Sequence, residues 1–485
     1  MSHEIRQLQP EKLWNKFADL NAIPRPSKKE ERVIAFMKEF GNSLQLSTEV
    51  DNAGNVLIKK PATPGMEDRQ TVVLQSHLDM VHQKNAATDF DFSSQGINMY
   101  EKDGWVRAKG TTLGADNGIG VATIMAILES NDIKHPALEA LFTIDEETGM
   151  TGAFRLKPDW LSGTILLNLD TEEDDEIGIG CAGGIDVNAS LAYEEEQAPS
   201  NTKTYQLVVK GLQGGHSGMD INKGLGNANK IMNRLLRGVQ AYKVRLSSLE
   251  GGSLRNAIPR ESFATIAVDF TSGAIFEKKI EELAEAIKQE YSKTDPDLEI
   301  KVDRKKEEAV EVVPEDIQTN ILSAMEDLHN GVYKMSSAIP DLVETSNNIA
   351  KVTVKNGKAI IQCLTRSSVE SEKEKLVTEL SEVLESKGFS VKAEGSYPGW
   401  TPNRDSKILK VLEKIYEQQN GSKAHVAACH AGLECGIIGQ HYPEMDMISF
   451  GPTIKGAHSP DERVSISSVQ KYWKFVKEIL ENIPE

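Results

Sequence analysis

Histidine and carboxylate side chains recur in short polar segments that follow apolar stretches or lie in loops. Imidazole nitrogens and carboxylate oxygens bind zinc, manganese and cobalt, and a paired site needs one carboxylate that bridges two ions about 3.5–4 Å apart. Repeated in this way, these residue types would suit a site for two divalent cations. The residues concerned are His77, Asp79, Asp116, Glu146, Glu147, Asp170 and His458.

Neighbouring residues within these segments are expected to take different tasks. His77 and Asp79 are two positions apart at the end of an expected strand, which is too tight for both side chains to chelate one ion. Asp79 is better suited to accept a hydrogen bond from the second imidazole nitrogen. Glu146 and Glu147 are adjacent, so at most one of them is expected to point at a given ion. The other could hold an attacking water.

Each of these motifs also has an ordinary structural explanation. A lone histidine at a strand end is usually structural, a Glu-Glu pair is usually solvated, and the segment 116–118 (Asp-Asn-Gly) favours a turn. The occurrence of so many ligand types after successive apolar strands weakens these explanations. The residues alone leave a metal site and an ordinary polar surface equally supported.

Two further motifs give only weak indications of function. The glycine-rich segment 211–218 lacks the Gly-Lys-Ser/Thr ending of a phosphate-binding loop, and that type of loop does not explain its His216. Cys429 and Cys435 flank His430, but a Cys-His nucleophile pair needs closeness in space that sequence position does not establish. Buried free cysteines are common, so nucleophilic catalysis by either cysteine is a weak hypothesis.

Alternating strands and helices are expected to position the polar residues. Short apolar runs predict buried strands, and the spacing of Val121, Ile124, Met125 and Leu128 predicts a helix between the first two of them. This order favours a mostly parallel sheet, in which a binding crevice forms at the carboxyl ends of the strands. The predicted strands are 71–75, 138–144, 164–169 and 445–450, and the predicted helices are 119–128 and 469–483.

The middle of the chain has a different pattern. A helix over 275–291 is strongly amphipathic, with Ile275, Ile280, Leu283, Ile287 and Tyr291 on one face. A similar order of elements follows a second time, with a hairpin turning at Asn-Gly in the segment 350–364. The predicted strands are 204–210, 261–270 and 298–302, and the other predicted helices are 225–236, 317–328 and 376–384.

Composition excludes several classes of protein. The chain of 485 residues has 55 basic and 73 acidic side chains, a net charge of −18, which disfavours nucleic acid and membrane as partners. Four cysteines without a Cys-x-x-Cys pair form no disulfide framework and no thiolate zinc site. The N-terminal residues lack the apolar core of a signal peptide, and no apolar run reaches the roughly 18 residues that span a bilayer. We therefore expect a cytoplasmic protein.

The ordered motifs resemble those of the co-catalytic zinc exopeptidases, a family that includes carboxypeptidase G, aminoacylases and bacterial dipeptidases. Within it, the chain is most similar to the aminoacyl-histidine (Xaa-His, β-alanyl-histidine) dipeptidases, nearly from end to end. The motifs that carry this narrower resemblance are Lys60-Pro-Ala-Thr63, Gly110-Thr-Thr-Leu-Gly-Ala-Asp-Asn-Gly118, Cys181-Ala-Gly-Gly-Ile-Asp186, His430-Ala-Gly-Leu-Glu-Cys-Gly436 and Tyr442-Pro-Glu-Met-Asp-Met447.

The resemblance implies a set of metal ligands. It implies that His77 and Asp170 hold one ion and that Glu147 and His458 hold the other. Asp116 would bridge the two ions. The expected cofactor is two divalent ions per chain, zinc first, with cobalt or manganese as alternatives.

The resemblance also implies roles around the ions. Glu146 would be the general base, and Asp79 would orient the metal-binding imidazole. His216, in a Gly-Gly-His-Ser-Gly setting, would assist the scissile carbonyl, either in its own chain's site or in a partner's. Asn256 and Arg366 would contact the carboxylate end of the substrate.

The order of the predicted elements and the resemblance together imply a fold and an activity. The expected fold class is α/β: a metal-binding catalytic domain with a mixed, mostly parallel sheet, formed by 1–186 and 401–485. The residues 187–400 would form an inserted α+β lid, made of two βαββαβ-like halves. The expected activity is hydrolysis of Xaa-His dipeptides, including β-Ala-His, by a water activated by two divalent ions and Glu146. The expected partners are a small dipeptide substrate and a second copy of the chain in a homodimer.

Two other functions stay open. The same metal chemistry would serve an N-acylamino-acid deacylase or a carboxypeptidase, and one sequence does not reveal the specificity pocket. A metal-binding protein without turnover would keep the same ligands. An acidic residue left free to act as a base, such as Glu146, argues against that last function.

Overall fold

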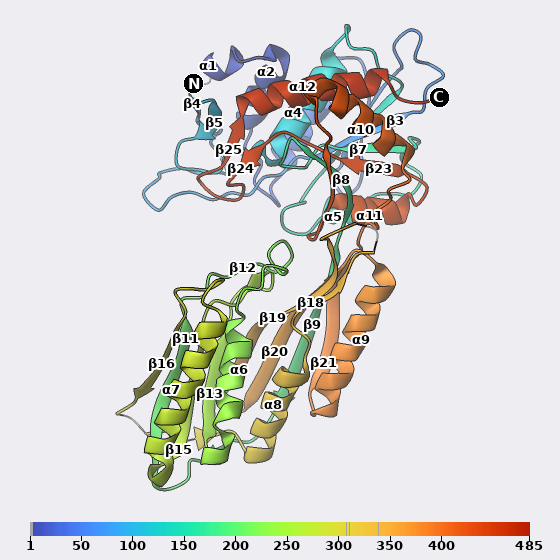
Figure 1. Cartoon of the computed structure of the whole chain (residues 1–485). Helices are drawn as coiled ribbons and strands as arrows, with labels where there is room; N and C mark the ends of the chain where they lie inside the picture. Colours follow the sequence, from blue (N-terminus) through green and yellow to red (C-terminus); the bar gives the residue numbers. More distant parts are fainter. Residues whose placement is uncertain (1–2, 307, 310, 338) are drawn as a thin grey trace. The chain divides into compact units, whose positions relative to one another are not determined.

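The computed structural model of the chain describes residues 3–306, 308–309, 311–337 and 339–485. These residues form two compact units (Figure 1). Unit 1 comprises Met1–Cys181, Trp400–Ala428 and Leu433–Glu485, and unit 2 comprises Ala182–Gly399 and Cys429–Gly432. The boundary expected between 186 and 187 falls inside strand β9 (Gly183–Ala192), which belongs to unit 2.

An eight-stranded sheet with the order β1-β2-β6-β3-β7-β23-β8-β22 forms the centre of unit 1. The four central strands β6, β3, β7 and β23 pair in parallel, and the strands predicted from the sequence correspond to them. The pairs β1–β2, β2–β6 and β8–β23 are antiparallel. The bounds are Ser47–Val50 (β1), Val56–Lys60 (β2), Val72–His77 (β3), Leu138–Thr143 (β6), Ile165–Asn168 (β7), Glu176–Cys181 (β8), His425–Cys429 (β22) and Asp446–Ser449 (β23).

This pairing confirms the expected mixed sheet, in which the parallel pairs are those of the central strands. Strands β1 and β2 are separated by only a short turn, and strands joined in this way can pair only as an antiparallel hairpin. The parallel order is confined to the central strands, whose residues are buried throughout β3, β6 and β7. Strands buried on both faces are expected where helices cover both faces of a sheet.

Helix α4 (Ala115–Glu129) is the helix that follows the central strand β3. It is buried on nearly all sides, from Gly118 to Leu128, and packs against β3 and α2. Helices that are apolar all round occupy such interior positions. The other helices of unit 1 are α1 (His3–Arg6), α2 (Glu11–Asn21), α3 (Glu31–Ser43), α5 (Thr151–Phe154), α10 (Lys407–Asn420), α11 (Glu434–His441) and α12 (Ile466–Glu481).

A second, small sheet in unit 1 has the order β24-β25-β5-β4 and brings the C-terminal part of the chain beside residues near 100. Its strands are Ile454–Lys455 (β24), Arg463–Ser465 (β25), Trp105–Ala108 (β5) and Met99–Lys102 (β4). The loop between β24 and β25 carries His458. In the part of the chain that the structure describes, no helix is both long enough and apolar enough to cross a membrane.

Unit 2 is built on a nine-stranded sheet in which all the pairs formed by its long strands are antiparallel. Its order is β16-β11-β15-β13-β19-β20-β9-β21, and β18 pairs with β19. The strands are β9, Thr202–Lys210 (β11), Arg245–Gly251 (β13), Ser262–Asp269 (β15), Glu299–Arg304 (β16), Gly331–Met335 (β18), Val343–Lys355 (β19), Lys358–Ser367 (β20) and Ser390–Tyr397 (β21).

The order of elements divides this sheet into two halves. The first half runs β11, α6 (Ala228–Gly238), β13, β15, α7 (Gly273–Glu290), β16. The second runs β9, α8 (Glu315–Asp327), β19, β20, α9 (Glu370–Ser386), β21, and the whole first half is inserted between β9 and α8. In each half the first strand lies between the last and the third. Both halves therefore have the predicted βαββαβ order, and the antiparallel pair β13–β19 joins them.

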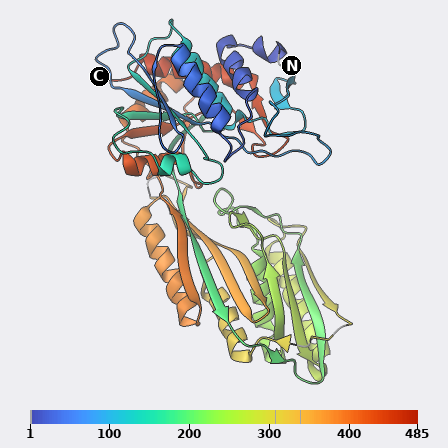
Figure 2. The same cartoon turned by 180° about the vertical axis from the view of Figure 1, so that it is seen from behind.

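Two short strand pairs and two short 3-10 helices complete unit 2. Strand β12 (Gly215–His216) pairs with β14 (Ala257–Ile258), and β10 (Glu196–Gln197) pairs with β17 (Glu311–Val312). The 3-10 helices cover Gln240–Tyr242 and Phe270–Ser272. Figure 1 shows α6, α7, α8 and α9 on one face of the large sheet, and Figure 2 shows the same sheet from behind.

The hairpin predicted at Asn356-Gly357 joins β19 to β20, and Lys355 pairs with Lys358 across it. Asn356 and Gly357 have φ values of 53° and 71°. A two-residue turn of this kind needs positive φ at both positions, which asparagine and glycine adopt most readily. The hairpin prediction is confirmed.

The buried face of α7 differs from the predicted one by one position. Phe276, Ile280, Ala284 and Ile287 are buried in the core of unit 2, whereas Ile275 is 60% exposed. Phe276 and Ala284 lie four residues before and after Ile280, and Ile287 lies seven residues after it, so these side chains share one face of the helix. Ile275 lies outside this buried stripe. The prediction is wrong at Ile275, and it omitted Phe276 and Ala284.

This difference gives a test of the core of unit 2. We expect Phe276→Ala to lower the free energy of unfolding by about 3–5 kcal/mol, because the side chain is fully buried and its ring lies 5.1 Å from that of Tyr205. Ile275→Ala, on the same helix, should change it by less than about 0.5 kcal/mol. Urea unfolding followed by circular dichroism measures both, and equal effects of the two substitutions would contradict this packing.

Candidate metal centre

The parallel strands of unit 1 bring the polar segments to one edge of the sheet. His77 is the last residue of β3, and Asp170 follows the end of its neighbour β7. Glu146 and Glu147 follow the end of β6, the other neighbour of β3. Because the carboxyl ends of parallel strands share an edge, these side chains lie close together. Asp116 comes from the first turn of α4.

Asp116 stands between two imidazole rings. Its Oδ1 lies 3.2 Å from His77 Nε2, and its Oδ2 lies 3.2 Å from His458 Nε2. His77 Nε2 is also 3.5 Å from Asp170 Oδ1, and His458 Nε2 is 3.0 Å from Glu147 Oε2. Each of two ligand groups thus contains one histidine, one further carboxylate and one oxygen of the shared Asp116, with ligand atoms within 4.8 Å of one another.

Glu146 lies at the margin of the first ligand group. Its Oε2 is 4.0 Å from His77 Nε2. Burial raises the pKa of Glu146 well above its usual value; the charge of His77 opposes this rise, and those of Asp170 and Glu147 add to it. The pKa of Glu147 is also raised, first by burial and then by Asp116. Carboxylates gathered in a buried space repel one another and favour protonation or a bound cation.

The donor set therefore suits divalent cations. Imidazole nitrogens and carboxylate oxygens converge from a strand end, a helix start and several loops. The buried Glu147 Oε1 has no hydrogen-bond partner among the described residues. Buried polar atoms are normally satisfied, so an oxygen left in this way at a cluster of ligands is consistent with coordination. The geometry would allow two ions that share Asp116.

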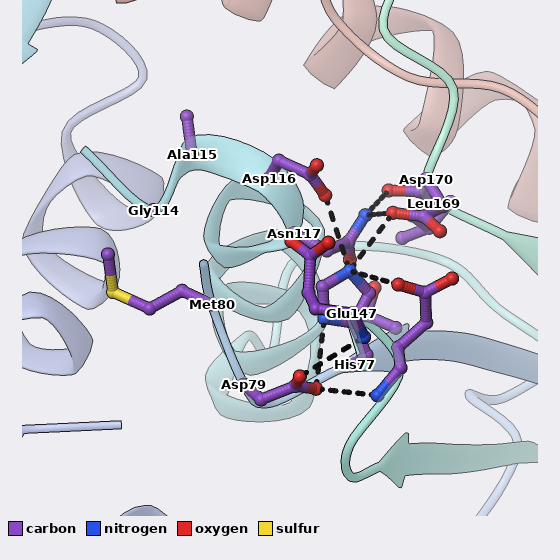
Figure 3. A network of polar contacts seen from close by, with 12 residues as sticks. His77, Asp79, Met80, Gly114, Ala115, Asp116, Asn117, Glu147, Leu169 and Asp170 are labelled. Carbon is purple, nitrogen blue, oxygen red and sulfur yellow. Dashed lines mark hydrogen bonds and ion pairs between the residues drawn. The ribbon is translucent and has the colours of Figure 1, made fainter. Parts of the chain in front are cut away.

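Asp79 supports the site from behind the His77 ring, on the side opposite Asp116 and Asp170 (Figure 3). The side chain of Asp79 is fully buried, and its Oδ1 lies 3.3 Å from His77 Nδ1. It also accepts hydrogen bonds from Ser27 Oγ at 2.8 Å and from the Glu146 backbone N–H at 3.0 Å. Burial alone would raise the pKa of Asp79, but these contacts, above all with His77, lower it. Asp79 thus orients both an imidazole and the segment that carries Glu146.

Sequence reasoning missed a buried polar chain beneath the site. The Glu434 carboxylate accepts hydrogen bonds from Gln75 Nε2 at 2.7 Å and Thr143 Oγ1 at 2.6 Å, and Gln75 Oε1 accepts one from Asn168 Nδ2 at 2.6 Å. Burial raises the pKa of Glu434 to about 7. The usable signal was a polar residue two positions before each of two ligands, inside strands that are otherwise apolar: Gln75 before His77, and Asn168 before Asp170.

Two other buried residues, Arg25 and Glu462, were also missed. Both hold backbone groups of the loops that carry the ligands. An arginine between two prolines and a glutamate four residues after His458 carry no motif that periodicity could detect. The glycines at 114 and 118 were the only signal, because a glycine often marks the close approach of another group.

The other predicted residues, His216, Asn256 and Arg366, belong to unit 2. His216 Nδ1 accepts hydrogen bonds from the backbone N–H groups of Gly218 and Met219, at 3.2 and 3.1 Å. Arg366 is buried and donates from Nη1 to the Tyr397 hydroxyl at 2.7 Å. The candidate metal ligands all belong to unit 1, so a joint action of these three residues with the ions stays a prediction.

His430 lies among polar residues of unit 2 and is 5% exposed. Its Nε2 lies 2.8 Å from Ser346 Oγ. Burial lowers the pKa of His430 to about 3, and the charges of Arg366 and His216 add to this effect. The folded protein therefore keeps this imidazole neutral at pH values where an exposed histidine is protonated.

This pKa predicts a loss of stability in acid. Below the usual pKa of 6.5, the unfolded chain takes up a proton that the folded His430 does not accept. The contribution of neutral His430 to the free energy of unfolding is therefore complete above pH 6.5 and declines as the pH falls toward 3. Between pH 7.5 and 5.0, wild type should lose about 2 kcal/mol more than His430→Gln in urea unfolding. His425→Gln, whose native side chain is 71% exposed, should follow wild type. Parallel pH profiles for all three proteins would contradict the assignment.

Comparison with known proteins identifies a family. Residues 73–482 match the model of the peptidase family M20/M25/M40. The chain is 42% identical over 482 residues to the cytosol non-specific dipeptidase of Escherichia coli (strain K12), with 99% of each chain covered.

Solved structures extend the comparison. The crystal structure of aminoacylhistidine dipeptidase from Vibrio alginolyticus matches with a TM-score of 0.92 and 44% identity over 100% of both chains. Aminopeptidase PepT from Bacillus cereus ATCC 10987 matches with a TM-score of 0.57 and 16% identity, over 98% of this chain and 99% of that one, which shows a shared fold alone. The family match and the full-length relatives together establish that the chain belongs to peptidase family M20/M25/M40.

Proposed function

We propose that the protein is a metal-dependent dipeptidase that hydrolyses Xaa-His dipeptides, including β-Ala-His. The observation that carries this proposal is the Asp116 carboxylate, whose two oxygens each lie 3.2 Å from a different imidazole. One carboxylate shared in this way is what a pair of catalytic cations requires. The names of the E. coli and V. alginolyticus relatives, both dipeptidases, support the substrate class.

In this proposal, His77 and Asp170 hold one ion, Glu147 and His458 hold the other, and Asp116 bridges them. Zinc is the proposed metal, with cobalt and manganese as alternatives that the same ligands accept. When bound, the ions would lower the pKa of a water and polarise the peptide carbonyl.

The chain's own groups would supply the proton transfers. Glu146 would accept the proton of the attacking water and deliver it to the leaving amine. Burial raises the pKa of Glu146, which moves this carboxylate toward the range in which a base works at neutral pH. Asp79 would keep the His77 ring in place through its 3.3 Å contact with Nδ1.

Residues of unit 2 would recognise the rest of the substrate. Arg366 is the proposed partner of the substrate carboxylate, supported by its burial and by an Nε that has no hydrogen-bond partner among the described residues. Asn256 would contact the same end, and His216 would assist the scissile carbonyl. Arginine recognises carboxylates well because its planar fork presents several donors.

A homodimer and a cytoplasmic location complete the proposal. The dimer is proposed from the family resemblance alone. The location is supported by the name of the E. coli relative, a cytosol dipeptidase.

The release of histidine from dipeptides tests this function. Metal-stripped protein should not cleave β-Ala-His or Ala-His, and addition of zinc or manganese should restore cleavage with little action on tripeptides. Other dipeptides belong in the panel, because the E. coli relative is called non-specific. Cleavage of N-acylamino acids alone would indicate a deacylase, and removal of residues from longer peptides would indicate a carboxypeptidase. Two bound ions with no turnover would indicate a metal-binding protein.

If Glu146 is the base and His77 is a ligand, their substitutions should differ in their effects on activity and on metal content. Glu146→Ala should lower kcat by about 10²–10⁴-fold while metal content stays near two ions per chain, because all the proposed ligands remain. His77→Ala should lose metal as well as activity, because a buried imidazole beside Asp116 and Asp170 is removed. Elemental analysis of both variants is the measurement. Loss of both ions from Glu146→Ala, or a fully metallated and active His77→Ala, would refute the respective role.

A further inference from the structure

Residues 113–116, which end at the shared Asp116, lie between two buried side chains of opposite charge. Glu462 and Arg25 are 2% and 1% exposed. Glu462 lies four residues after His458, and Arg25 lies in the loop between α2 and α3. Each binds backbone groups of this segment, which we call the Asp116 segment.

Glu462 accepts four hydrogen bonds from consecutive backbone N–H groups. Its Oε2 lies 2.7 Å from Leu113 N and 3.0 Å from Gly114 N, and its Oε1 lies 2.7 Å from Ala115 N and 3.3 Å from Asp116 N. All four donors point at one carboxylate, so both of its oxygens are needed as acceptors. This contact ties the Asp116 segment to the loop that carries His458.

Arg25 ties the same segment to the end of β3. Its Nη2 donates to the Gly114 carbonyl at 2.6 Å, and its Nη1 donates to the carbonyls of Leu78 and Asp79, both at 3.0 Å. A Cβ atom on Gly114 or Gly118 would lie 2.6 Å from Arg25 Nη2. The two glycines therefore make room for the guanidinium.

The opposite charges also support each other. Burial lowers the pKa of Arg25 to about 10, and the charge of Glu462 is the largest effect that opposes this fall. Removal of either charge would leave the other buried with less compensation.

We propose that Arg25 and Glu462 are positioning residues that hold the Asp116 carboxylate at the correct distance from both metal-binding histidines. Arg25 sets its position relative to His77, and Glu462 sets its position relative to His458. Because the proposed ions share Asp116, Arg25 and Glu462 together determine how tightly the protein binds both ions at once. This inference rests on the proposed two-metal function.

Glu462→Gln is the sharpest substitution. Glutamine has nearly the same shape, but its amide group would place N–H donors against two of the four backbone N–H groups. Replacement of residues that orient metal ligands typically weakens metal binding 10–100-fold. Glu462→Asp keeps the charge with a shorter reach and should give an intermediate loss.

Glu139 offers a matched control in the same unit. It is also 2% exposed, and its Oε2 accepts the backbone N–H groups of Ser162 and Gly163 at 2.8 and 3.0 Å. Glu139 lies at the start of β6, at the end opposite Glu146, and its carboxylate binds the backbone just before β7. Glu139→Gln therefore disturbs a similar buried carboxylate without touching a ligand loop.

The experiment titrates metal-free full-length proteins with zinc against a chromophoric chelator. Glu462→Gln should bind the second zinc ion at least about tenfold more weakly than wild type. Its kcat should change by a larger factor than its KM. Glu139→Gln should bind two ions as wild type does. Hydrogen exchange on the metal-free proteins gives an independent readout, because the amides of 113–116 should exchange faster in Glu462→Gln alone.

Each outcome discriminates. Wild-type zinc affinity in Glu462→Gln, or an equal loss in Glu139→Gln, would overturn the positioning role. A wild type that fails to bind two ions would instead overturn the proposed function, and the exchange of the 113–116 amides would still test the hydrogen bonds of Glu462. If Glu462→Gln does not fold, Glu462→Asp and Arg25→Lys take its place. Both should bind the second zinc ion more weakly than wild type and Glu139→Gln do, and wild-type zinc affinity in both would overturn the proposal.

Discussion

Repulsion between carboxylates at one buried edge of a sheet is the constraint on which the rest of unit 1 depends. Asp116, Glu146, Glu147 and Asp170 converge on two imidazoles, and burial raises the pKa of both glutamates. Such a group of like charges is stable only if opposite charges or aligned donors surround it. Arg25 places a buried positive charge near these carboxylates, and its contact with Gly114 holds the backbone beside Asp116. Asp79 fixes the His77 imidazole among them.

The apolar strands supply the rigidity that this arrangement needs. Strands β3, β6 and β7 are buried along their length, so their ends cannot shift without loss of packing. The polar residues begin where the strands end, and the chain of Gln75, Asn168 and Glu434 links neighbouring strands just beneath them. Sites carried by packed strands keep side chains in place more firmly than sites on long loops.

Patterns with a short period could be predicted from the sequence, and contacts between distant segments could not. The apolar runs predicted the central strands, and Asn356-Gly357 predicted its hairpin, because both depend on neighbouring residues. The proposed ligand set rests on residue types at strand ends together with the family resemblance. Arg25 and Glu462 escaped because each acts on backbone groups about 50 to 350 positions away, which leaves no local pattern. The one-position error at Ile275 came from a stripe of apolar residues that is wider than the buried face.

The insertion of one βαββαβ half inside the other determines the order in which the chain can complete its structure. The first half is continuous between Thr202 and Arg304, so its contacts are local enough to form early. Strand β9 can form its pairs only with β20 and β21, which follow more than 160 residues later in the chain. The pairing of β7 with β23 in unit 1 closes an even longer loop. During synthesis the inserted half can therefore fold first, and the proposed metal ligands come together only after His458 has left the ribosome.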